Sequence, residues 1–104
     1  MSKNVQNNKS FLDLLLNTSK EQALALLYTL TKPQLALITE IAYNILELPL
    51  PTKAQSHINK KKKLFQRLGS AKVSNSSKQA AIEKNASVIL HVLHALRQQL
   101  SELQ

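Results

Sequence analysis

Residues 31–48 read TKPQLALITEIAYNILEL, and this stretch decides the fold that the sequence predicts. Its spacing gives a helix with one polar face and, opposite it, a wide apolar stripe. The polar residues are Glu40, Asn44 and Glu47, and the apolar ones are Leu35, Ile38, Ile41, Ala42, Ile45 and Leu46. Thr31 stands three residues before Gln34, as in a capping box, and Pro33 suits a first helical turn. We therefore expect an amphipathic inner helix over residues 33–48.

Pairs of a hydroxyl residue and an acid or amide three residues later recur and divide the chain into helices. The hydroxyl can accept a hydrogen bond from a first-turn backbone N–H, while the acid or amide reaches back toward the cap. The pairs are Ser10 and Asp13, Ser19 and Gln22, Thr31 and Gln34, and Thr52 and Gln55. They predict helices over residues 11–16, 20–30, 33–48 and 53–68, with a break at Pro49 and Pro51, a stop at Gly69 and a polar linker over 70–77.

The C-terminal part of the chain has the most regular apolar pattern. Spacings of four and three alternate, as in the a/d repeat of a packed seam, through Ile82, Ala86, Ile89, Leu93, Leu96, Leu100 and Leu103. This pattern predicts one continuous helix over residues 78–103. We expect a single chain of this size to lack the apolar surface that would cover the seam. A homodimer is therefore predicted, with an interface formed by Ile82, Ile89, Leu93, Leu96 and Leu100.

Composition indicates a folded all-α protein with one domain. The chain has 104 residues, 43% of them hydrophobic, and only one glycine and three prolines, so it is too apolar to be mainly disordered. We expect a compact bundle of four to five helices over residues 10–104, after a flexible tail at 1–9. The chain has no cysteine, which fits a reducing compartment, and we expect a nuclear or virion location. No signal peptide or transmembrane segment is predicted.

Positive charge is concentrated in residues 53–84. This stretch contains nine basic residues and one acid, Glu83, and so accounts for the whole net charge of +8. Elsewhere five basic residues balance five acids. A neutral body with one cationic surface suits a polyanionic partner. The residues expected to contact the phosphates of a nucleic acid are Lys53, Lys60, Lys61, Lys62, Lys63, Arg67, Lys72 and Lys78.

The run of four lysines at 60–63 favours backbone contact with nucleic acid, DNA more than RNA, with little sequence preference. An anionic membrane surface or an acidic protein would suit the same charges. The main alternative is a helical protein-interaction or assembly module, in a virion or a regulatory complex, whose lysines serve solubility or nuclear import. A helix-turn-helix regulator is disfavoured because few side chains in this region read base edges. Tyr28, Tyr43 and Phe65 lie in apolar-periodic segments and are expected in the core, which does not support base stacking.

The sequence shows no pattern of residues typical of an enzyme. There is no glycine-rich phosphate loop, nucleophile elbow or pair of carboxylates, so we expect a non-enzymatic protein that needs no cofactor. His91 and His94 are three residues apart but fall outside the apolar seam, and His57 is distant in sequence. Because no cysteine or nearby acid completes a ligand set, we interpret these histidines as solvated rather than as metal ligands.

Several short motifs follow one another in an order that resembles a known family. They are Ala25-Leu26-Leu27, Glu40-Ile41-Ala42-Tyr43-Asn44-Ile45-Leu46, Pro49-Leu50, Lys60-Lys61-Lys62-Lys63, Phe65-Gln66-Arg67-Leu68 and Lys72-Val73-Ser74. This order resembles the small basic proteins of Maverick/Polinton and adintovirus-type DNA elements, over residues 24–93. The chain departs from their pattern at Asn85-Ala86, where they carry two glycines. The resemblance implies a small virion or core component that contacts the DNA of the element and can meet virion or host nuclear proteins.

Overall fold

The helices of the protein are short, and turns separate them where the sequence predicted longer ones. The structure, a computed structural model, describes residues 9–47 and 52–97. Within these ranges it contains no strand and the following helices: α2 (Lys9–Asn17), α3 (Lys20–Leu27), α4 (Lys32–Ile45), α5 (Thr52–Lys60), α6 (Lys62–Gly69), α7 (Asn75–Lys84) and α8 (Ala86–Ala95). The predicted all-α class is therefore confirmed. The predicted number of four to five is wrong, because the described residues alone form seven helices.

Two of the predicted helix caps are present as expected. The Ser19 side chain accepts a hydrogen bond from the backbone N–H of Gln22 at 3.2 Å and starts α3. At the start of α4, the Thr31 hydroxyl accepts from the N–H of Gln34 at 3.3 Å, and the Gln34 side chain accepts from the N–H of Thr31 at 3.0 Å. This reciprocal capping box satisfies two backbone donors that a helix end otherwise leaves without partners.

Other helix starts differ from the prediction. Ser10 lies inside α2, which begins one residue earlier, and therefore does not cap it. The predicted flexible tail at 1–9 lies outside the described residues except for Lys9, which is the first residue of α2. In the predicted linker, Ser74 accepts from the N–H of Ser77 at 3.2 Å and starts α7 three residues before the expected helix.

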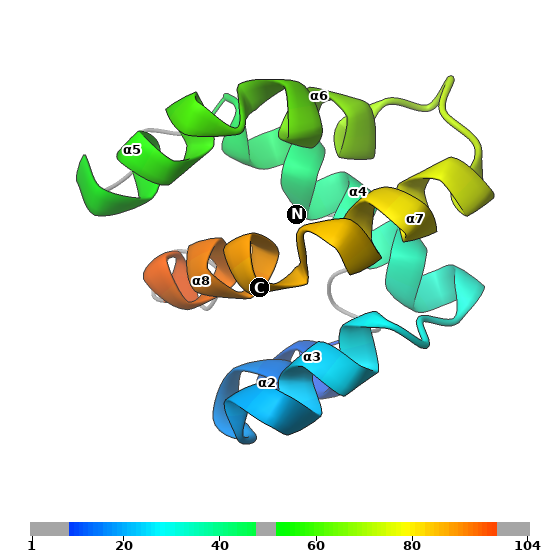
Figure 1. Ribbon diagram of the computed structural model, residues 1–104, viewed down its shortest axis with the longest axis vertical. Coiled ribbons are helices and arrows are strands. Elements are labelled where there is room, and N and C mark those ends of the chain that lie inside the picture. The colour runs from blue at the N-terminus through cyan, green and yellow to red at the C-terminus, as the bar shows by residue number, and fades with distance from the viewer. Residues whose placement is uncertain (1–8, 48–51, 98–104) are drawn as a thin grey trace.

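The predicted long helix at 53–68 is interrupted at Lys61. Its backbone there has φ −119° and ψ 29°, outside the helical region, and α5 ends on one side of it while α6 begins on the other. The interruption lets the two parts pack on different neighbours, α5 on α8 and α6 on α4 (Figure 1). Ile58 of α5 and Phe65 of α6 are both buried as a result.

The predicted continuous helix at 78–103 is also wrong, because it breaks at Asn85. This residue has φ −121° and ψ 24°, and its side-chain Nδ2 donates to the carbonyl oxygen of Ala81 at 2.9 Å. A short amide side chain can compete in this way with the regular helix hydrogen bonds. The chain turns between α7 and α8, and α8 then lies between α5 and the pair formed by α2 and α3 (Figure 1).

A homodimer was predicted because one chain was expected to leave the apolar seam exposed, but the seam residues of α8 are buried within a single chain. The predicted interface residues Ile82, Ile89, Leu93 and Leu96 are between 0% and 3% exposed in a single chain, and Leu100 lies outside the described residues. The expectation that one chain lacks the surface to cover this seam is thus wrong, since α2, α3, α5 and α7 contact α8. Of the predicted interface residues that the structure describes, none is exposed to a second chain.

The aromatic residues divide between core and surface. Phe65 is 3% exposed and confirms the prediction of a core position. Tyr28 and Tyr43 are 52% and 62% exposed, so their predicted burial is wrong. Tyr28 lies one residue beyond the end of α3, where it serves as the C-cap, and Tyr43 lies on the outer side of α4.

The C-terminal end of α6 lies very close to α4. A Cβ atom added to Gly69 would be 2.9 Å from both the Cα and the N of Tyr43. These are backbone atoms of a helix and cannot rotate away, so this contact requires a glycine. Gly69 is also the last residue of α6, one residue beyond the predicted helix end, and it does not adopt the positive φ typical of a glycine that stops a helix.

Within the described ranges, none of the helices combines the length and apolar character that crossing a membrane demands.

Candidate functional site

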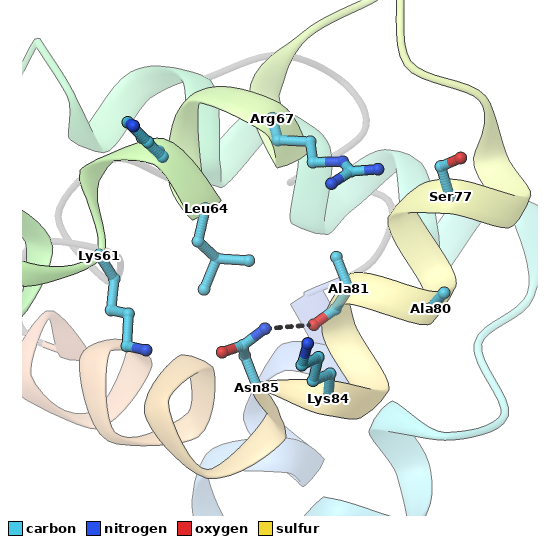
Figure 2. Close-up of a pocket in the computed structure, with 9 residues that line it drawn as sticks. Lys61, Leu64, Arg67, Ser77, Ala80, Ala81, Lys84 and Asn85 are labelled. Atoms are coloured by element: carbon cyan, nitrogen blue, oxygen red, sulfur yellow. Dashed lines mark hydrogen bonds between the residues drawn. The ribbon is translucent and has the colours of Figure 1, made fainter.

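A groove of about 540 Å³ lies between α6 and α7 (Figure 2). Residues three, four and seven apart share one face of a helix, and the α7 face turned to the groove carries short side chains at Ala80 and Ala81. Leu64 of α6 points into the groove and, with these alanines, forms an apolar floor. The full lining consists of Lys61, Lys63, Leu64, Arg67, Ser77, Ala80, Ala81, Lys84 and Asn85.

Four cations surround the groove. Lys61, Lys63 and Arg67 come from the α6 side and Lys84 from α7, and all four are exposed. No aspartate or glutamate is among the described residues that line the groove. Arg67 extends from α6 toward the start of α7, near Ser77 (Figure 2). The arrangement concentrates positive potential over an apolar floor, which suits an anion more than a neutral ligand.

Asn85 and Ser77 stand at the α7 side of the same groove. The Nδ2 group of Asn85 is occupied by the carbonyl oxygen of Ala81, as the dashed line in Figure 2 marks. This bond uses one of the two amide hydrogens of Asn85. The four cations remain the principal donors that the groove offers.

The other predicted phosphate contacts are spread over the surface. Lys60 and Lys62 are exposed but do not line the groove, and Lys72 is exposed in the turn between α6 and α7. The side chain of Lys53 lies outside the described residues. Of the eight predicted contacts, the structure thus brings together Lys61, Lys63 and Arg67.

Lys78 is not available to a phosphate, and its prediction as a contact is wrong. It is 4% exposed, and its Nζ donates to the Thr39 hydroxyl of α4 at 3.1 Å. Lys78 and Ile82 are four residues apart in α7 and share its inward face. Burial disfavours the ammonium form and lowers the pKa of Lys78 below its ordinary value.

Two residues of the site were not predicted from the sequence. Lys84 was counted in the charged stretch but not assigned a contact, although it follows Ser77 by seven residues and therefore shares its face. Tyr28 was assigned to the core. It lines a second depression of about 340 Å³, which shares Lys61, Lys84 and Asn85 with the groove.

His57 and His91 are far apart in sequence but lie close together in the structure. The rings of His57 in α5 and His91 in α8 lie 4.3 Å apart between centroids, in an edge-to-face arrangement at 64°. His94 is exposed on α8. In the ranges that the structure covers, no group of three or more histidine, cysteine or acidic side chains could hold a metal ion.

Comparisons of the chain with models of protein families, with curated proteins and with solved structures found no match. The resemblance to Maverick/Polinton and adintovirus-type proteins therefore stays a prediction. What the groove does has to be inferred from its own geometry and charge.

Proposed function

We propose that this protein is a non-enzymatic nucleic-acid-binding protein that holds the phosphate backbone in the groove between α6 and α7. The observation that carries the proposal is the lining of this groove, with Lys61, Lys63, Arg67 and Lys84 and no acid among its described residues. Each cation that neutralises a phosphate releases condensed counterions, and this release drives binding at low salt.

The donor set favours backbone contact over reading of base sequence. Three of the four cations are lysines, which act as point charges, and Arg67 is the one guanidinium able to bind a guanine edge with two hydrogen bonds. The Asn85 amide already donates one of its hydrogens to the Ala81 carbonyl, which restricts its orientation. We therefore propose weak discrimination among sequences. A preference for DNA, and a role as a virion or core component, are supported by the sequence resemblance alone.

Binding to a short duplex, measured against salt concentration, tests the proposal. Four phosphate contacts predict that log K falls with log salt at a slope of about −3.6, since each contributes about 0.9. A triple variant with Lys63→Gln, Arg67→Gln and Lys84→Gln should lose most of the affinity and most of the slope. Its matched control carries Lys9→Gln, Lys20→Gln and Lys32→Gln, which also removes three exposed cations but none from the groove.

The control triple should keep the slope of the unmodified protein. Equal losses in the two triple variants would mean that net charge, and not the groove, governs binding. A slope near zero for the unmodified protein would refute nucleic-acid binding through these cations.

A second candidate function, a protein-interaction or assembly module, is favoured by a different surface. A groove of about 410 Å³ on α2 and α3 is lined by Leu14, Thr18, Gln22, Ala25, Leu26 and Thr29, and Leu14 is 51% exposed. A second copy of the chain could bind there and leave both cationic grooves open. Sedimentation should then show a dimer that Leu14→Asp converts to a monomer. A folded monomer at high micromolar concentration of the unmodified protein would exclude this homodimer.

A further inference from the structure

The position of Tyr28 adds a specific element to the cationic groove. This residue caps the C-terminal end of α3, where its backbone N–H donates to the carbonyl oxygen of Ala25 at 3.1 Å and the next N–H, of Thr29, donates to that of Leu26 at 3.2 Å. The backbone of the residue is therefore fixed while its side chain is 52% exposed. A large exposed aromatic ring on a rigid backbone is a favourable surface for stacking, because little conformational entropy is lost on binding.

The Tyr28 side chain lies next to the cationic groove. The depression that it lines also contains Lys61, Lys84 and Asn85, and these three residues line the groove as well. The two hollows thus form one continuous surface that passes between Lys61 and Lys84. One end of it presents cations over a small apolar floor, and the other end presents an aromatic ring.

The two ends differ in charge. The groove lining contains no described acid, whereas Glu83 lines the depression together with the apolar side chains of Leu24 and Val88. A carboxylate repels a phosphate but can accept a hydrogen bond from the amino group of a base. Phosphate is therefore favoured in the groove, and the flat face and polar edge of a base are favoured in the depression beside Tyr28.

We infer that the preferred ligand of this surface is single-stranded nucleic acid, with a base stacked on Tyr28 and the adjoining phosphates held by the groove cations. This inference rests on the proposed function and names its substrate class. In a duplex the faces of the bases are covered by their neighbours, and only an unpaired base can lie against the tyrosine ring. Stacking of this kind tolerates any base, consistent with a groove that has few groups for reading sequence.

The experiment compares a labelled single strand with the duplex of the same sequence, by fluorescence anisotropy on the full chain. The single strand should bind more tightly, and Tyr28→Ala should weaken its binding by about tenfold to a hundredfold. The same variant should leave duplex affinity and the salt slope of the duplex unchanged. Tyr28→Phe, which keeps the ring, should stay within about twofold of the unmodified protein because stacking uses the π face.

Tyr43 provides the matched control. It is 62% exposed but is not among the described residues that line the groove or the depression. Tyr43→Ala should therefore leave binding of the single strand unchanged. A strand carrying 5-iodouracil should form a photochemical cross-link that mass spectrometry places at Tyr28 and not at Tyr43, which are the two tyrosines of the chain.

The outcomes separate this inference from the proposed function. Salt-dependent binding that Tyr28→Ala does not change on the single strand would overturn the stacking site and leave the phosphate groove intact. A duplex that binds as tightly as the single strand would overturn the stated preference. Absence of salt-dependent binding to either form would overturn both proposals together.

Discussion

Replacing Gly69 with alanine tests the close contact between α6 and α4, on which the position of the groove depends. The added Cβ would lie 2.9 Å from the Cα and N of Tyr43 and 3.2 Å from its Cβ. Both nearest atoms belong to a helix backbone, so α6 must shift as a unit. Overpacking of this kind costs about 1–3 kcal/mol, whereas alanine gains at most about 1 kcal/mol over glycine in helix propensity.

The propensity gain applies to helix interiors, and Gly69 is the last residue of α6, so this gain offsets little there. The net expectation for Gly69→Ala is therefore a loss of about 1–3 kcal/mol in the free energy of unfolding. For a domain of this size each kcal/mol shifts the Tm by about 4–8 °C, so the Tm should fall by about 4–24 °C. Circular dichroism during thermal and urea unfolding measures both quantities. Gln66→Ala, at an exposed position of the same helix, is the control and should be neutral or slightly stabilising.

An unchanged or raised Tm for Gly69→Ala would refute the reasoning, because it would mean that α6 does not approach α4 as closely as described. A second readout follows from the position of Arg67 on α6, in the groove. Movement of α6 should weaken nucleic-acid binding even though glycine itself touches no ligand.

Three further variants test other parts of the structure. Lys78→Met should raise the free energy of unfolding without weakening nucleic-acid binding, because it removes an ammonium group buried against Thr39. The pKa of Lys78 is lowered in the folded state, so the free energy of unfolding of the unmodified protein should rise as the pH approaches 10.5, the ordinary pKa. Urea unfolding at several pH values should therefore show that the stability difference between the unmodified protein and Lys78→Met narrows as pH rises. A stability difference that does not change with pH would contradict this. Leu93→Asp, at a position 3% exposed, should cost about 3–5 kcal/mol and abolish the cooperative far-UV transition whatever the protein concentration, whereas concentration-dependent recovery would indicate a dimer interface. Glu83→Ala should weaken single-strand binding by up to about fivefold, because it removes the carboxylate that accepts a hydrogen bond from the base beside Tyr28, and tighter binding would contradict this acceptor role.

The starts of α3 and α4 could be predicted from local sequence, but the helix interruptions could not. The caps at Ser19 and Thr31 act within a few residues and leave a recognisable pattern. The break at Lys61 depends on α5 and α6 packing against different neighbours, which no local window contains. The break at Asn85 had a weak signal, because an asparagine inside an apolar repeat can bond to a carbonyl of the preceding turn.

The sequence predicted which region of the chain is positively charged, but not which of its side chains lie together in the groove. Lys78 was expected to contact phosphate but shares the inward face of α7 with Ile82, whereas Lys84, which was assigned no contact, lines the groove. Tyr28 was placed in the core because it continues an apolar segment, but α3 ends one residue before it. The charge pattern does not say which face of α7 packs on α4, and the apolar pattern does not say where α3 ends.

The turn at residues 70–74 connects the two helices that form the walls of the groove. Lys61 through Asn85 is one uninterrupted stretch of sequence, and it supplies every side chain that lines the groove. Both walls are held against α4, α6 through Gly69 at Tyr43 and α7 through Lys78 at Thr39. Insertions or deletions in the turn would therefore mainly alter the end of the groove near Arg67 and Ser77, where the chain enters and leaves the turn. Natural variation or protein engineering could change the length of this turn. Such a change would alter the size of ligand that the groove accepts while the helices stay in place.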